Sequence, residues 1–171
     1  SNDLPHRKHA GEVIHIPLNN FGRAAGCISL EEIEKNLKEN ESQINYVAVT
    51  GVSNVTGIIN PIYDIAELAH SHGALIIVDG AQMVSHLPVK ISGHKNPARN
   101  LDAFVFSGHK TYVPGSPGVV VCRKDILKSI EPEEVGGGMV DRVFVDRYEV
   151  TNKFPDREEA GTPNIPGAIG L

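Results

Sequence analysis

Short runs of apolar residues alternate along the chain with segments in which apolar and polar positions mix. Runs 74–80, 101–108 and 118–122 are almost continuously apolar and short, which predicts β-strands buried in a sheet. Segment 44–51, which ends in glycine, predicts a further strand, and segment 12–16 a short one. The strands are therefore expected to form most of the core.

Segment 29–40 has the pattern of an amphipathic helix. Ser29 is a typical N-cap residue, and acidic residues occupy the first turn, where they favour the helix dipole. The apolar positions recur at helical intervals: Leu30, Ile33 and Leu37. The acidic residues at 31–34 are expected to form its solvated face.

A second helix is predicted over residues 60–73. Asn60 is expected at the N-cap and Pro61 at the first helical position, where its missing N–H costs nothing. Gly73 is expected to end the helix because glycine readily adopts a left-handed conformation.

Strands that alternate with helices predict an α/β fold with a mostly parallel sheet flanked by helices. Polar residues and glycines follow three of the predicted strands at their carboxyl ends: Thr50-Gly51, Asp79-Gly80 and Ser107-Gly108. In open α/β sheets ligands bind at this edge. The sequence therefore predicts one candidate site at the carboxyl edge of the sheet.

Composition narrows the choice of partners and compartment. The 171 residues carry a formal net charge of −5, which disfavours nucleic acid or an anionic membrane as the main partner. No apolar run is long enough to span a bilayer, and the N-terminal stretch lacks the apolar segment of a secretory signal. Cys27 and Cys122 form no disulfide or metal motif, and Cys122 is expected in the core. The histidines show no metal-ligand spacing. A cytoplasmic protein without a metal site is expected.

Candidate chemistry arises from a motif that occurs twice. Ser-Gly-His-Lys stands at 92–95 and again at 107–110. Lys95 lies in a loop and is expected to be a solvated charge, whereas Lys110 follows a buried strand and can reach the sheet edge. Asp79 ends a neighbouring strand, where it could cap a helix, form a salt bridge or bind a cationic ligand nitrogen. Lysine and carboxylate together suit pyridoxal phosphate, which needs an amine for its aldehyde and an acid beside its ring nitrogen.

Four ordered motifs make the chain similar to a known family: SNVTGIINPI, GALIIVDGAQ, LDAFVFSGHK and EAGTPNIPGAIGL. Together they resemble the class V aminotransferases, pyridoxal-phosphate enzymes of fold type I, and most closely the cysteine desulfurase and selenocysteine lyase-like proteins. The resemblance runs from about Val13 to Leu171. The loop after Lys110 departs from the desulfurase pattern at Val113 and at Ser116-Pro117.

The resemblance implies a role for each of seven residues. Lys110 would form the Schiff base with the cofactor and move the proton at the substrate's α-carbon, and Asp79 would bind the pyridine nitrogen. Gln82 would bind the phenolic oxygen of the ring, and Asn54 would lie near the same oxygen or the substrate. Ser107 and His109 would contact the phosphate, and Thr162 of the Gly161-Thr162 pair the phosphate of a partner subunit. Without the resemblance, Gln82 would be interpreted as a surface residue and His109 as a structural histidine. Asn54 and Thr162 would be interpreted as turn and cap residues.

The resemblance also implies that residues 1–171 are a single-domain fragment. They would form the central part of the large domain and lack its N-terminal part and the C-terminal small domain, with a helix beginning near Pro166. The fragment is expected to be inactive. The full-length protein is expected to be a homodimer that acts on an amino acid by transamination, β-lyase chemistry, racemisation or desulfuration. The alternative is a non-catalytic α/β binding module that kept the fold.

Overall fold

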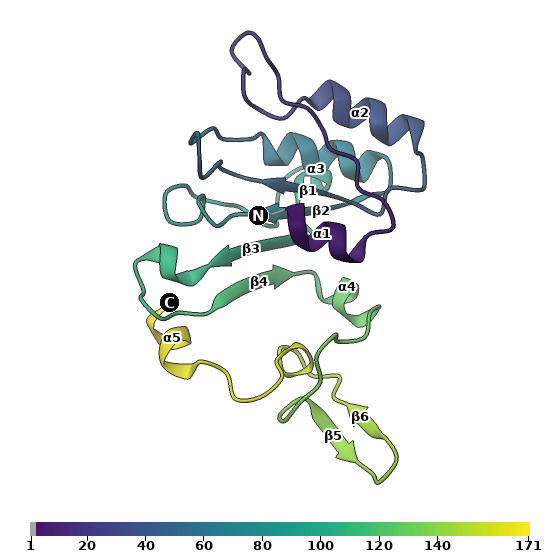
Figure 1. Cartoon of the computed structure of the whole chain (residues 1–171), viewed down its shortest axis with the longest axis vertical. Helices are drawn as coiled ribbons and strands as arrows, with labels where there is room; N and C mark the ends of the chain where they lie inside the picture. The colour runs from purple at the N-terminus through teal and green to yellow at the C-terminus, as the bar shows by residue number, and fades with distance from the viewer. Residues whose placement is uncertain (1–2) are drawn as a thin grey trace.

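The computed structural model describes residues 3–171, and a four-stranded sheet forms its centre (Figure 1). The strands lie in the order β1 (Tyr46–Thr50), β2 (Leu75–Asp79), β3 (Ala103–Ser107) and β4 (Gly118–Cys122). β1, β2 and β3 are parallel, and β4 is antiparallel to β3. The predicted α/β fold with a mostly parallel sheet is confirmed.

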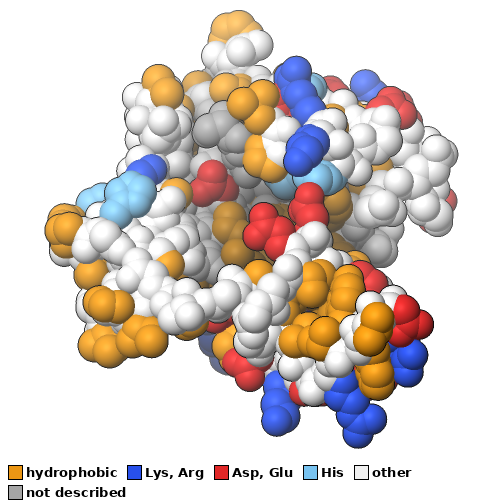
Figure 2. Space-filling view, turned by 60° about the horizontal axis from the view of Figure 1, so that its bottom comes forward, with side chains coloured by type: hydrophobic (Ala, Val, Ile, Leu, Met, Phe, Trp, Pro, Cys, Tyr) orange, Lys and Arg blue, Asp and Glu red, His pale blue; other side chains and the backbone are white. Residues whose placement is uncertain are grey.

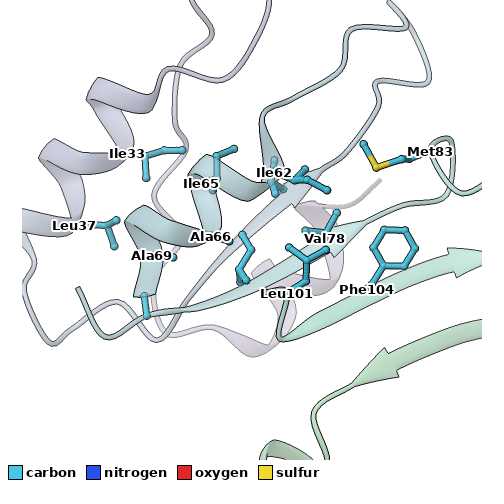
Figure 3. Close-up of a cluster of buried hydrophobic side chains, with 13 residues drawn as sticks. Ile33, Leu37, Ile62, Ile65, Ala66, Ala69, Val78, Met83, Leu101 and Phe104 are labelled. Atoms are coloured by element: carbon cyan, nitrogen blue, oxygen red, sulfur yellow. The ribbon is translucent and has the colours of Figure 1, made fainter. Parts of the chain in front are cut away.

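The helix α3 (Ile62–Ser71) packs on one face of the sheet, and α2 (Leu30–Glu39) packs against α3. Figure 3 shows the apolar side chains of α3 between those of α2 and those of β2 and β3. The buried cluster has thirteen members: Ile33, Leu37, Val49, Ile62, Ile65, Ala66, Ala69, Ala74, Ile76, Val78, Met83, Leu101 and Phe104. Burial of this apolar surface is the main force that holds helices and sheet together.

α2 begins as predicted, because the Ser29 hydroxyl accepts a hydrogen bond from the Glu32 amide (3.2 Å). The start of α3 differs from the prediction. Its first helical residue follows Pro61, and no side chain caps it. Asn60 instead is buried, accepts from the Ile28 amide (3.0 Å) and donates to the Thr50 carbonyl (2.9 Å). Its amide is therefore used to join distant segments.

Gly73 ends α3 as predicted. Its φ of +74° lies in the left-handed region that glycine adopts without strain, and its amide donates to the carbonyl of His70. The chain turns there and enters β2 directly.

The opposite face of the sheet is less covered. α1 (Asp3–His9) reaches it through His6, whose Nδ1 lies 3.1 Å from the Tyr46 hydroxyl. Along β2, fully buried residues on the helix-covered side alternate with partly buried residues on this side. The run 74–80 is therefore apolar on two faces, of which only one is completely buried.

The predicted strand at 12–16 does not form. Those residues pair with no strand among residues 3–171, and the nearest bridge joins Leu18 to Ile28. An apolar run needs a neighbouring strand edge for its backbone groups, and this one has none in the described part. Cys122 is also not in the core: it lies on the outermost strand and is half-buried, which still raises the pKa of its thiol.

Beyond β4 the chain forms smaller elements: α4 (Lys124–Lys128), β5 (Val140–Val143), β6 (Tyr148–Val150) and α5 (Ile165–Gly170), the last as predicted near Pro166. Three 3₁₀ turns complete the described elements: η1 (Pro97–Arg99), η2 (Gly108–Thr111) and η3 (Asp156–Glu158). The β5–β6 hairpin extends away from the main sheet (Figure 1). None of the helices within residues 3–171 has the length and apolar character to cross a membrane.

Candidate functional site

Three strand ends meet at one edge of the sheet. Thr50 at the end of β1 pairs with Asp79 at the end of β2, and Asp79 pairs with Val105 of β3. β3 continues two residues further, to Ser107. Because neighbouring strands lie about 5 Å apart, the structure brings Asp79 and the segment after Ser107 to the same edge.

Asp79 presents part of its carboxylate to this edge. The residue is half-buried, and its Oδ1 accepts a hydrogen bond from the Ala81 amide (3.0 Å). No hydrogen bond to Oδ2 exists within residues 3–171, so this oxygen is available to a ligand donor. The next residue, Gly80, is buried, and a Cβ there would lie 1.9 Å from the Phe104 ring. The chain can leave β2 this tightly only with glycine at position 80.

Lys110 lies on η2, immediately after β3. The turn is tied at its base, where the Gly108 amide donates to the Pro117 carbonyl (3.0 Å) and the Thr111 hydroxyl to the Gly108 carbonyl (2.6 Å). Lys110 is half-buried, and among the described residues its amine makes no hydrogen bond or ion pair. Such an amine is free to act as a nucleophile toward a bound ligand.

Three further predicted residues lie on the same two segments. Ser107 and Gln82 are half-buried and His109 is exposed. Gln82 belongs to a series of turns over 81–86, opened by hydrogen bonds from the amides of Met83 and Val84 to the Gly80 carbonyl (both 2.9 Å). Gln82 therefore lies on consecutive turns directly after the end of β2.

Asn54 and Thr162 lie on other segments. Asn54 is exposed in the loop between Val52 and Ile59, which pair by an isolated bridge. Thr162 is exposed next to Gly161, whose amide donates to the Gly137 carbonyl (2.8 Å). In the described part of the chain no hydrogen bond connects either side chain to Asp79 or Lys110. Their roles stay predictions.

The first copy of the doubled motif, residues 92–95, is structural. Its loop is fastened to α3, where the rings of Tyr63 and His94 lie 4.7 Å apart and Asn96 donates to Glu67 (2.9 Å). Lys95 itself is exposed, as predicted. The two Ser-Gly-His-Lys motifs therefore have the same residues but different structural surroundings.

A charged cluster that sequence reasoning missed lies at the opposite end of β3. Asp102 is buried and accepts hydrogen bonds from His70, from the Ile76 amide and from Arg123. The signal available was an aspartate at the start of an apolar run, a position where an unpaired carboxylate is costly.

Two depressions are bordered by residues other than the seven predicted site residues. One of about 510 Å³ is bordered by Arg157 and the β5–β6 hairpin, and one of about 430 Å³ by Cys27 and the loop before α2. Figure 2 shows apolar and charged side chains together on the lobe at the lower right. Within residues 3–171, no group of three or more metal-ligating side chains is arranged to hold an ion.

Comparison with known proteins gives consistent matches. The family model Aminotransferase class-V matches residues 6–171. A probable cysteine desulfurase of Halalkalibacterium halodurans is 44% identical over 147 residues, which are 85% of this chain and 34% of that protein. A cysteine desulfurase of Escherichia coli is 41% identical over 156 residues, which are 91% of this chain and 36% of that protein.

Solved structures agree. The cysteine desulfurase of Escherichia coli in its S-sulfonic acid form superposes with a TM-score of 0.81 at 29% identity, over 99% of this chain and 40% of that one. The apo cysteine desulfurase of Thermococcus onnurineus gives 0.72 at 37% identity, over 85% and 34%. The chain thus spans roughly a third of the length of the curated relatives that it matches.

Proposed function

Because the chain belongs to the aminotransferase class-V family, we propose that it forms the cofactor-binding core of an enzyme that acts on an amino acid. The resemblance predicted from the four motifs is confirmed by the family match over residues 6–171. Class-V aminotransferases and cysteine desulfurases depend on pyridoxal phosphate. The 44% identity to a probable cysteine desulfurase makes cysteine the favoured substrate.

The observation that carries the proposal is that Asp79 ends β2 and Lys110 follows β3, which is the neighbouring parallel strand. Among residues 3–171, one carboxylate oxygen of Asp79 accepts from no donor, which suits the protonated ring nitrogen of the cofactor. Within the same residues the Lys110 amine has no acceptor, which suits the cofactor's aldehyde. The groups present at this edge fit pyridoxal phosphate.

Lys110 has the covalent role in this proposal. Its amine would hold the cofactor by condensing with the aldehyde, with loss of water. When bound, the cofactor would supply an electron sink for the substrate. The Lys110 amine would then hold or move the proton at the substrate's α-carbon.

Other side chains would bind and orient the cofactor. Ser107 and His109 directly precede Lys110 and would supply a hydroxyl and an imidazole as phosphate donors. Gln82 lies three residues beyond Asp79 and would reach the ring oxygen, with Asn54 near the same oxygen. Thr162, on an exposed segment, would contact the phosphate of a partner subunit in a homodimer.

The extent of the domain is part of the same proposal. We infer that residues 1–171, of which 1 and 2 lie outside the described part, form one domain fragment of a longer protein. The supporting fact is that the chain spans 34–36% of its relatives. We expect the isolated chain to be inactive, and normal turnover by these 171 residues alone would contradict this.

The decisive experiment maps the lysine that binds the cofactor. The full-length protein is incubated with pyridoxal phosphate, reduced with borohydride, digested and analysed by mass spectrometry. The label is expected on Lys110 and absent from Lys110→Ala, while Lys95→Ala is labelled like the unsubstituted protein. Label on Lys95, or no label at all, would favour the non-catalytic binding module.

A further inference from the structure

We propose that Asn164 is a positioning residue that holds the loop carrying Lys110 in place. The inference rests on the proposed function of Lys110 and adds a residue that the sequence reasoning did not select. Asn164 lies 54 positions after Lys110, just before α5, and Figure 1 shows α5 beside the loop that joins β3 to β4. The contacts of this one amide connect the two segments.

Both ends of the Asn164 amide are used. Its Nδ2 donates to the Gly115 carbonyl (2.6 Å), and its Oδ1 accepts from the Gly167 amide (3.1 Å). The oxygen therefore caps the start of α5, while the nitrogen reaches into the loop after Lys110. An aspartate at position 164 could still accept from the Gly167 amide. It could not donate to the Gly115 carbonyl, because a carboxylate has no donor.

The backbone of α5 packs directly on the same loop. A Cβ on Gly167 would lie 2.8 Å from the Gly115 carbonyl oxygen, and one on Gly170 would lie 2.8 Å from Cγ1 of Val113. These approaches leave no space for larger residues. Val113 is one of the departures from the desulfurase pattern. It thus belongs to the contact between α5 and the loop, which the hydrogen bond from Asn164 also stabilises.

The loop needs such support because its conformation is strained. Tyr112, two residues after Lys110, has a φ of +66°, and a left-handed residue other than glycine costs about 1–2 kcal/mol. Its side chain is 78% exposed, so burial of the ring cannot compensate. The compensation lies in the loop's hydrogen bonds: Ser116 Oγ to the Val113 carbonyl (2.8 Å), Gly108 N to the Pro117 carbonyl (3.0 Å), and Asn164 to Gly115.

Of these three ties, only that of Asn164 comes from outside the loop and η2. The other two would move together with Lys110 if the whole loop shifted relative to the sheet edge. Asn164 fixes the loop to α5, and with it the position of the Lys110 amine relative to Asp79.

The test uses Asn164→Asp, which keeps the α5 cap and loses the donor to Gly115. The matched control is Asn96→Asp. Asn96 also caps a helical turn, by accepting from the Ala98 amide (3.1 Å), and also donates from Nδ2, to Glu67 (2.9 Å). Asn164→Ala serves as a second variant if the aspartate prevents folding.

The first readout is hydrogen exchange of peptides that cover residues 111–117 in the cofactor-free full-length protein. We expect exchange about tenfold faster in Asn164→Asp, corresponding to the loss of one hydrogen bond, and no change in Asn96→Asp. Equal exchange in the two variants would overturn the proposal, because Asn164 would then not hold the loop.

The second readout separates positioning from simple stabilisation. The rate at which pyridoxal phosphate becomes trappable by borohydride on Lys110 is expected to fall about tenfold in Asn164→Asp, at a melting temperature no lower than that of Asn96→Asp. Faster loop exchange with an unchanged rate would show a structural role only and overturn the proposal. If the unsubstituted protein forms no adduct, the proposed function itself fails, and this is known before any variant is compared.

Discussion

The carboxylate of Asp102 lies 2.8 Å from Nε2 of His70, at a position where only 2% of the aspartate is exposed. The same carboxylate accepts from the Ile76 amide (2.8 Å) and from Arg123 Nη1 (2.7 Å). Nδ1 of His70 faces the Ala98 carbonyl (2.7 Å). Asp102 therefore joins α3, β2, η1 and the end of β4 at the side of the sheet away from the candidate site.

Replacement of Asp102 by alanine is expected to destabilise the fold by about 3 kcal/mol, because it leaves buried donors unpaired. Asp125→Ala is the control, since Asp125 is exposed and also pairs with Arg123 (2.5 Å). It should change stability little, as exposed ion pairs do. Urea unfolding of both variants measures the difference, and equal midpoints would contradict the structural role of Asp102.

Asp102 should also make stability depend on pH in the acid range. Burial alone would raise the pKa of its carboxyl, but hydrogen bonds from His70, the Ile76 amide and Arg123 outweigh burial and hold the pKa below its usual 3.8. The unfolded state then binds a proton at a higher pH than the folded state, so stability is lost as pH falls below about 4. Asp102→Asn, which cannot titrate, should lose this part of the acid dependence. The measurement is the free energy of unfolding against pH for the unsubstituted protein and for Asp102→Asn. Parallel curves would refute the contribution of Asp102 to acid sensitivity.

Gly80→Ala is expected to destabilise the protein by about 2 kcal/mol through overpacking. The new methyl group would lie 1.9 Å from the Phe104 ring. Phe104→Leu should relieve the clash, so the double variant should be more stable than the sum of the single changes predicts. Gly137→Ala is the control, because a Cβ there meets nothing within 4 Å. If the changes in unfolding free energy of the two single variants simply add up in the double variant, the new methyl group does not clash with the Phe104 ring.

Asp79→Asn should weaken pyridoxal phosphate binding by about 10- to 100-fold, since a hydrogen bond to a charged group contributes about 1.5–3 kcal/mol. Fluorescence titration of the full-length protein measures the dissociation constant. Asp64→Asn removes the exposed ion pair with Arg99 and should bind normally. Unchanged binding in Asp79→Asn would remove Asp79 from the proposed site.

Ser29→Ala should cost about 1 kcal/mol, because the Glu32 amide at the start of α2 loses its acceptor. Ser71→Ala is the matched control: that hydroxyl is exposed and donates to the Leu68 carbonyl at the end of α3. Thermal melts of the two variants give the comparison, and a larger loss from Ser71→Ala would argue against the cap.

Local pattern predicted the frame of the fold. β2 follows from an apolar run that ends in Asp79, and the end of α3 from Gly73, since both depend on neighbours in sequence. Asn60 shows the limit of such reasoning. Its neighbours indicate a helix cap, yet its partners are Ile28 and Thr50, which lie 32 and 10 positions away. A polar side chain with long-range partners looks like a cap until the fold is known.

The candidate site divides in the same way. The edge position of Asp79 and Lys110 was predictable because Asp79 ends one parallel strand and Lys110 follows the next, and the strand register then brings both to a shared edge. Asn164 was not, because its partner Gly115 is 49 positions away in a loop without pattern. The four-residue motif Ser-Gly-His-Lys is identical around Lys95 and Lys110, so it cannot show which lysine belongs to the site. The strand that precedes Lys110 makes the difference.

The outermost strand has a practical consequence for handling the polypeptide. Within residues 3–171, β4 pairs only with β3, so its other side offers free amide and carbonyl groups, and Val120 and Val121 beside them are 67% and 39% exposed. An open apolar edge is a template for stacking against identical molecules. These 171 residues by themselves should therefore aggregate as their concentration rises. A soluble sample needs a partner or an added segment that pairs with the free edge of β4.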